Sequence, residues 1–272
     1  MKEIVKGFTD DLSTSERKLI VGTHGSERTG KSNFAATAPD PIGVIPLDRN
    51  TRWTMRKVAE EYGKKIIFPK RDFIRQDAGE LLRISHLPDD RAVSEAKKYY
   101  RKHLDYVKEA LYSLYASEDV KTVVVDTGTQ LWEDVMFAHF GRYHRVMPRD
   151  RGVPNQEMAD LITACPHHMI ITHRSAEIWK NDKSTGKHKP GGFPHIGYYC
   201  NVMVEHGKRR AKSEDGKVLR GEPPEFFMKV FDCTANPELM GDDEESTLVG
   251  PECDFAVLGT RVYPGTKLED WS

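Results

Sequence analysis

A glycine-rich motif near the N-terminus constrains the fold of this chain more than any other feature. Residues 22–32 read GTHGSERTGKS, and positions 25–32 fill the pattern G-x-x-x-x-G-K-[ST]. Backbone N–H groups of such a turn converge on phosphate oxygens when a strand precedes the turn and a helix follows it. Both flanks fit, because KLIVGTH (18–24) is typical of a buried strand and KSNFAATA (31–38) predicts a short helix that the following prolines end.

The motif gives its polar side chains expected roles. Lys31 is expected to reach the β- and γ-phosphates of a nucleoside triphosphate, and the Ser32 hydroxyl to bind Mg²⁺. A glycine turn without function is the alternative, and the flanking strand and helix argue against it. The predicted nucleotide-binding residues are Gly25, Ser26, Glu27, Arg28, Thr29, Gly30, Lys31 and Ser32.

An aspartate follows a second apolar run. KTVVVDT (121–127) has the near-continuous apolar pattern of a central parallel strand and places Asp126 at its carboxyl end. That position lies at the sheet edge beside the phosphate motif, so Asp126 is expected to hold Mg²⁺ together with Ser32. A turn or a helix cap would also explain an aspartate at a strand end.

A carboxylate that orients water toward the γ-phosphate is also expected near this edge. Asp48 ends the second predicted strand (42–48) and is the first candidate, with Glu133 and Glu27 as rivals. Asp48 also stands where it would cap the helix predicted over 51–63, so both roles stay open.

Strands and helices alternate along the first two thirds of the sequence. Further helices are predicted over 91–117, 130–144 and 156–165, and further strands over 64–70 and 167–174. Strands then follow one another over 200–207, 224–234 and 254–263. This order predicts an α/β core with added antiparallel strands toward the C-terminus. No repeat or domain boundary is evident, so residues 18–272 are expected to form one domain after a polar arm over 1–17.

The segment SAEIWKNDKSTGKHKPGGFPHIGYY (175–199) lacks periodicity and is expected to be a long loop. Its basic residues could neutralise phosphates while its aromatic rings stack on unpaired bases, although a solvated charge run has the same composition. The candidate DNA contacts are Lys180, Lys183, Lys187, Lys189 and Phe193, with Trp179 and Tyr198 nearby.

A second basic cluster, HGKRRAK, occupies residues 206–212. If subunits stack, Lys208, Arg209 or Arg210 would reach the γ-phosphate of a neighbouring subunit as a trans-acting residue. A solvated hairpin is the alternative.

Two segments carry a resemblance to a known family. GSERTGKSNFAATAPDPIGVIPLDRNTR (25–52), followed by KTVVVDTGTQLWEDV (121–135), resembles phage-encoded RecA-like ATPases, and most closely the Sak-four-type single-strand annealing proteins. The resemblance covers about residues 18–175 well. It implies a RecA-like P-loop core with a mostly parallel central sheet, ATP and Mg²⁺ bound between subunits of a ring or filament, and single-stranded DNA as the substrate in phage recombination or replication.

The resemblance also implies roles for individual residues. Asp48 stands where the family carries its catalytic acid, although an aspartate is one methylene shorter than the glutamate of RecA itself. His173 ends the strand predicted over 167–174, where RecA-like proteins often place a polar sensor of the γ-phosphate; a hydrogen-bonded strand end is the plainer alternative. The loop over 175–198 stands where the family carries its DNA-binding loop.

The composition argues against several other classes of protein. A formal net charge of -1 lacks the basic excess of a non-specific polyanion binder, so DNA binding is expected to need a local patch and oligomerisation. No run approaches the roughly 18 apolar residues of a membrane span, and the N-terminus has no signal-peptide core. The four cysteines show no C-x-x-C pair. These features predict a cytoplasmic protein with reduced thiols and no membrane contact, in the bacterial host if phage-encoded.

Two other functions use the same motif. A small-molecule kinase would transfer the γ-phosphoryl group to a metabolite under a mobile lid, for which the nearest cluster is Arg142, Arg145, Arg149 and Arg151. A non-hydrolysing module would use ATP only to gate DNA binding or assembly. The sequence leaves open whether the assembly is a ring or a filament, and whether a single-strand binding protein is a partner.

Overall fold

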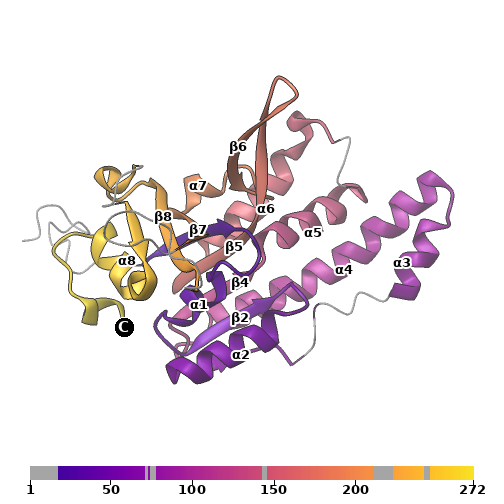
Figure 1. Ribbon diagram of the computed structural model, residues 1–272. Helices are drawn as coiled ribbons and strands as arrows, with labels where there is room; N and C mark the ends of the chain where they lie inside the picture. Colours follow the sequence, from indigo (N-terminus) through magenta and orange to yellow (C-terminus); the bar gives the residue numbers. More distant parts are fainter. Residues whose placement is uncertain (1–17, 71–72, 74–77, 143–145, 211–222, 242–245) are drawn as a thin grey trace, which may run out of the picture.

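A mostly parallel sheet forms the centre of the structure (Figure 1). This computed structural model describes residues 18–70, 73, 78–142, 146–210, 223–241 and 246–272, so the arm expected over 1–17 lies outside the described residues. The strands are β1 (Ile20–Gly25), β2 (Ile42–Pro46), β3 (Ile66–Ile67), β4 (Thr122–Asp126), β5 (His168–Lys180), β6 (Lys183–Pro190), β7 (Val202–Arg209), β8 (Glu225–Cys233) and β9 (Thr247–Val249). The helices are α1 (Lys31–Ala36), α2 (Thr51–Tyr62), α3 (Ala78–Ser85), α4 (Asp89–Tyr115), α5 (Gly128–Phe140), α6 (Gly152–Thr163), α7 (Ile196–Tyr199) and α8 (Phe255–Val262).

The strand order is β3-β2-β4-β5-β1-β7-β8-β9, and β6 pairs with β5 outside this path. Neighbours from β3 through β7 are parallel, whereas β8 and β9 are antiparallel. The fold class expected from the sequence is therefore confirmed as an α/β fold with a mostly parallel central sheet and antiparallel strands toward the C-terminus. One strand, β5, separates the strand that leads into the phosphate motif from the strand that ends in Asp126.

Both faces of the parallel sheet are covered, which explains the continuous apolar runs of β1, β2 and β4. Successive side chains alternate between two cores. Ile20 and Val125 belong to the core that includes residues of α4, α5 and α6, while Val21 and Val124 belong to the core under α1, α2 and α8. Alternation along the strands therefore holds helices on both faces and leaves the carboxyl ends of the parallel strands at one edge.

The prediction of a loop over 175–199 is wrong for most of that segment. Strand β5 continues to Lys180 and turns back through Asn181 and Asp182 into β6, forming an antiparallel hairpin that projects from the body (Figure 1). Asn181 and Asp182 both have positive φ, at 51° and 59°. Two such residues give a turn whose twist matches that of the strands, and Asn and Asp tolerate this conformation well.

The prediction of a strand over 254–263 is also wrong, because this segment forms α8. Asp254 caps the helix: its side chain accepts hydrogen bonds from the backbone N–H groups of Ala256 at 2.8 Å and Val257 at 3.3 Å. Packing then overrides the β-branched composition, since Phe255, Leu258 and Val262 are all buried on one face. The strand expected over 64–70 shrinks to β3, an edge strand that stops before Pro69.

No helix of the described residues combines the length and apolar character needed to cross a membrane. All four cysteines are free thiols, of which Cys165, Cys200 and Cys233 are buried.

Candidate functional site

The phosphate motif forms a tight loop between β1 and α1. The Lys31 ammonium folds back over this loop and donates to the carbonyl oxygens of Gly25 and Ser26, each at 2.7 Å. Thr29 Oγ1 donates to the same Ser26 carbonyl at 2.8 Å. Gly25 has φ +154°, and a Cβ added there would lie 2.3 Å from the backbone oxygen of His206. The loop therefore rests directly on β7, and only glycine fits at its first position.

Asp126 lies at the carboxyl end of β4, beside this loop. Its two carboxylate oxygens accept hydrogen bonds from the hydroxyls of Thr51, at 2.5 Å, and Thr172. Thr172 stands opposite Asp126 in the parallel pairing of β4 with β5, and Thr51 is the first residue of α2. Three elements therefore hold the carboxylate in one orientation. The sequence pattern missed both threonines, since only the register of β5 and the start of α2 bring them to Asp126.

Charges converge on the same edge. Burial raises the pKa of Asp126; the threonine hydroxyls and Lys31 oppose this effect, and Asp48 adds to it. Burial lowers the pKa of Lys31, while Asp126 and Glu27 counteract that shift. Asp126 thus lies close enough to act on both Lys31 and Asp48. An ammonium, two carboxylates and the nearby Ser32 at the start of α1 meet where the phosphate loop ends.

This donor set fits Mg²⁺ bound with a nucleotide. Mg²⁺ prefers oxygen ligands, keeps several waters and is usually held by one or two carboxylates together with substrate phosphates. Ser32 and Asp126 would supply the protein oxygens, and Lys31 would neutralise phosphate charge. The buried carboxylate is itself consistent with a cation, because its charge is otherwise only partly compensated.

The three candidates for the water-orienting carboxylate occupy different environments. Asp48 is half-buried, its backbone N–H donates to the Asp126 carbonyl at 3.1 Å, and its side chain accepts from the Asn50 N–H at 3.2 Å. Glu27 is exposed on the phosphate loop. Burial raises the pKa of the Tyr100 phenol of α4, and Glu133 of α5 adds a smaller contribution, so Glu133 lies near Tyr100. The geometry therefore favours Asp48. Its alternative role as the cap of α2 is wrong, because Asn50 is the N-cap residue and no side chain of the described residues caps that end of the helix.

Buried histidines line the strand ends behind the loop. His24 of β1 stands opposite His173 of β5, and His206 of β7 stands opposite Gly25. Burial lowers the pKa of His24 and His173 to about 4 and that of His206 to about 3, so all three are neutral near pH 7. His173 Nδ1 donates to the Gly191 carbonyl at 3.0 Å. The expected sensor is thus tied to the root of the hairpin, which sequence reasoning had treated as a loop.

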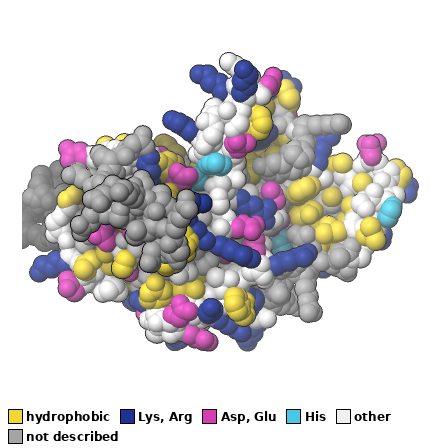
Figure 2. All heavy atoms as spheres, viewed as in Figure 1, with side chains coloured by type: hydrophobic (Ala, Val, Ile, Leu, Met, Phe, Trp, Pro, Cys, Tyr) yellow, Lys and Arg dark blue, Asp and Glu magenta, His cyan; other side chains and the backbone are white. Residues whose placement is uncertain are grey.

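The hairpin carries the expected basic residues on its surface. Lys180, Lys183, Lys187 and Lys189 are exposed, and Figure 2 shows Lys and Arg side chains gathered on this projection. Phe193 is different: it is only 1% exposed and packs against Trp132 and Tyr199. The structure therefore contradicts its expected role in base stacking, because a ring in the core cannot meet a base.

The candidate trans-acting residues contact the same chain. Lys208 Nζ lies 5.0 Å from the centre of the Phe226 ring, and Arg209 Nε lies 2.7 Å from a Glu225 carboxylate oxygen. Phe226 reaches the phosphate loop, since a Cβ on Gly30 would lie 3.6 Å from its ring. The β7–β8 extension with Lys208 therefore flanks its own loop, and Arg210 follows at the end of β7.

No protein-family model and no curated protein matches this sequence. Several solved structures, including the following three, show distant likeness. The RadB recombinase has 12% identity and a TM-score of 0.40, covering 85% of this chain and 86% of that chain. The flagellar accessory protein FlaH from Methanocaldococcus jannaschii has 10% identity and a TM-score of 0.39, covering 85% and 84%. A prototypical ATPase from the type III secretion system of pathogenic bacteria has 10% identity and a TM-score of 0.34, covering 72% and 52%.

Proposed function

We propose that this protein binds and hydrolyses ATP with Mg²⁺, and that it binds single-stranded DNA and promotes annealing or strand handling in phage recombination or replication. The observation that carries the proposal is the meeting of Lys31, Asp126 and Asp48 at one edge of the sheet, next to Ser32. Isolated strand-end aspartates are common, but phosphoryl transfer needs what this edge offers: a phosphate loop and a buried carboxylate that interacts with both a cation and a second carboxylate.

Each residue has a chemical task in this proposal. Lys31 would exchange its hydrogen bonds to the Gly25 and Ser26 carbonyls for β- and γ-phosphate oxygens. Bound Mg²⁺ would neutralise charge developing on those phosphates. Ser32 and Asp126 would hold the cation, and Asp48 would orient the attacking water.

The hairpin is the proposed DNA contact. It carries four lysines and only two acidic residues, Glu177 and Asp182. Trp179, 61% exposed on β5, replaces Phe193 as the ring available for a base. His173 and Thr129 both contact the Gly191 carbonyl at the hairpin root, at 3.0 Å each. These contacts support a role of His173 in coupling the two sites. Assembly into an oligomer, with Lys208, Arg209 or Arg210 near a subunit boundary, belongs to the same proposal.

The experiment that tests this function is phosphate release from ATP by the purified protein, with and without Mg²⁺, single-stranded DNA and nucleoside monophosphates. Turnover that needs Mg²⁺ and rises with single-stranded DNA is expected. Strict dependence on a nucleotide acceptor would instead identify a kinase. Nucleotide-dependent DNA binding without measurable turnover would identify a non-hydrolysing module.

The hairpin makes a separate prediction. Replacing Lys183 and Lys187 by alanine should reduce the slope of log affinity against log salt by about 1.4, because each lost single-strand phosphate contact contributes about 0.7. Trp179→Ala should weaken DNA binding by about 10-fold through lost stacking. Fluorescence anisotropy of a labelled oligothymidylate measures both. Lys97→Ala with Lys102→Ala, two exposed lysines of α4, is the charge-matched control, and an equal loss in that control would show that the hairpin has no special role.

A further inference from the structure

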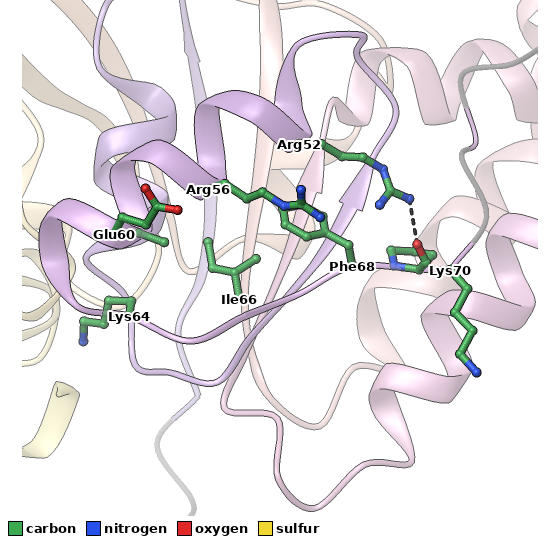
Figure 3. A pocket seen from close by; sticks show the side chains of 9 residues that line it. Arg52, Arg56, Glu60, Lys64, Ile66, Phe68 and Lys70 are labelled. Atoms are coloured by element: carbon green, nitrogen blue, oxygen red, sulfur yellow. Dashed lines mark hydrogen bonds between the residues drawn. The ribbon is translucent and has the colours of Figure 1, made fainter.

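A basic cavity lies between α2 and the β3 edge of the sheet, and no residue of the phosphate loop lines it. It has a volume of about 460 Å³ and is lined by residues of α2 and by the segment from Lys64 to Lys70. Figure 3 shows Arg52 and Arg56 reaching into it from α2, above Phe68, with Lys70 at one end. Neither the phosphate motif nor the hairpin contributes to this cavity, so the function proposed above does not account for it.

Two guanidinium groups are already positioned in the cavity. The Arg52 and Arg56 guanidinium carbons lie 5.3 Å and 5.5 Å from the centre of the Phe68 ring, within the range of cation–π attraction. Arg52 is further fixed by a hydrogen bond from Nη2 to the Pro69 carbonyl at 2.7 Å. Since these residues are one helical turn apart, the ring aligns both groups before any ligand binds. Such preorganisation reduces the entropy lost on binding.

The charge of the cavity is uneven. Glu60 and Lys64 lie at the end opposite Lys70 in Figure 3, and Lys64 is 3.6 Å from Asp40. The acidic residue of the lining therefore lies at the end of the cavity away from Lys70. In the described part of the chain, neither Arg56 nor Lys70 has a hydrogen-bond or ion-pair partner. This end of the cavity therefore presents two cations with unused donors, Arg56 and Lys70, beside the Arg52 guanidinium.

The ligand chemistry follows from these groups. A planar guanidinium presents paired N–H donors that match phosphate oxygens, and a lysine adds a point charge. Arg56 and Lys70 together suit a multiply charged phosphate better than a single carboxylate. We propose that the α2–β3 cavity is a second phosphate-binding site, separate from the phosphate loop, for the phosphates of a nucleic-acid strand or of a free nucleotide.

The test uses the full chain carrying Lys31→Ala, so that the phosphate loop does not contribute. Calorimetry with tripolyphosphate and anisotropy with labelled oligothymidylate distinguish the two phosphate sources. Adding Arg56→Ala and Lys70→Ala is expected to weaken at least one probe by about 10-fold, because charge-assisted bonds to phosphate are lost. Loss confined to tripolyphosphate assigns a free nucleotide, and loss confined to the oligonucleotide assigns a strand.

Two further variants distinguish a phosphate site with defined geometry from a non-specific effect of positive charge. Arg56→Lys keeps the charge but loses the paired donors, so it should weaken binding as well. Lys57→Ala with Lys97→Ala removes two exposed cations outside the cavity and should leave both affinities unchanged. The proposal is overturned if neither probe responds to Arg56→Ala with Lys70→Ala, or if the control pair causes the same loss. Because no readout uses ATP turnover, and the hairpin lysines are unchanged in every variant of this test, the outcome is independent of the proposed ATPase.

Discussion

Lys31→Ala is expected to abolish nucleotide-dependent activity while leaving the fold intact. The ammonium is the group that would neutralise the β- and γ-phosphates, and removing such an electrostatic contact costs about 100-fold to 1,000-fold in rate. Burial lowers the pKa of Lys31, which means that its charge is held at a cost in the folded state. Its removal should therefore leave the melting temperature unchanged or raise it.

Three measurements test this prediction: ATP turnover, nucleotide binding by calorimetry and thermal unfolding. Lys57→Ala is the matched control, since this exposed lysine lies on α2 and stacks on Trp53 away from the phosphate loop. Turnover retained in Lys31→Ala would contradict the assignment of the loop. A collapse of the melting temperature would mean that the two hydrogen bonds to the loop carbonyls are structural rather than replaceable.

Asp126→Asn is expected to produce opposite changes in activity and stability. The neutral amide would be a poor Mg²⁺ ligand, so Mg²⁺-dependent turnover should fall by about 100-fold or more. Without nucleotide, however, the variant should be the more stable protein near neutral pH. Burial raises the pKa of Asp126 above its value of 3.8 in the unfolded chain, so ionisation of this group disfavours folding.

The direction of the Asp126 pKa shift sets the pH range over which stability should be measured. The stability associated with protonated Asp126 is fully present below the unfolded pKa of 3.8 and is lost as pH rises through the raised folded pKa. The advantage of Asp126→Asn should therefore vanish in acid and grow toward neutral pH. Thermal unfolding across that range measures it, and Asp119→Asn, an acidic residue outside the site, should show no such trend.

ATP with Mg²⁺ should stabilise the wild type by about 2.7 kcal/mol at 100 times the dissociation constant, and the variant much less. Equal stabilisation of both would show that Asp126 does not meet the cation.

Local patterns were sufficient for the parts of the site that belong to single segments. The loop from Gly25 to Ser32 is a contiguous motif, and Asp126 ends an apolar run whose length marks a buried strand. The hairpin had a local signal that was overlooked, because Asn181 and Asp182 suit the positive φ of a two-residue turn. The helix α8 also had one, in Asp254 as a cap before an apolar face.

Other features depend on pairings between distant segments, which no local pattern contains. Trp132 and Tyr199 come together around Phe193 and remove its ring from the surface. Asp48 and Glu133 are both acidic residues near predicted strand or helix ends, and only packing sends one toward Asp126 and the other toward Tyr100.

By itself, the sequence determined the phosphate loop, the acidic strand ends and the α/β class, because each rests on residue spacing within one element or on the order of elements. The tertiary structure decided which strands are neighbours. Placing β5 between β1 and β4 brings Thr172 to Asp126 and His173 to His24, and it projects the hairpin from that same strand. It also placed Phe68 beneath Arg52 and Arg56. These contacts exist only after chain segments far apart in sequence have packed, since their energy comes from burial and charge shared across elements.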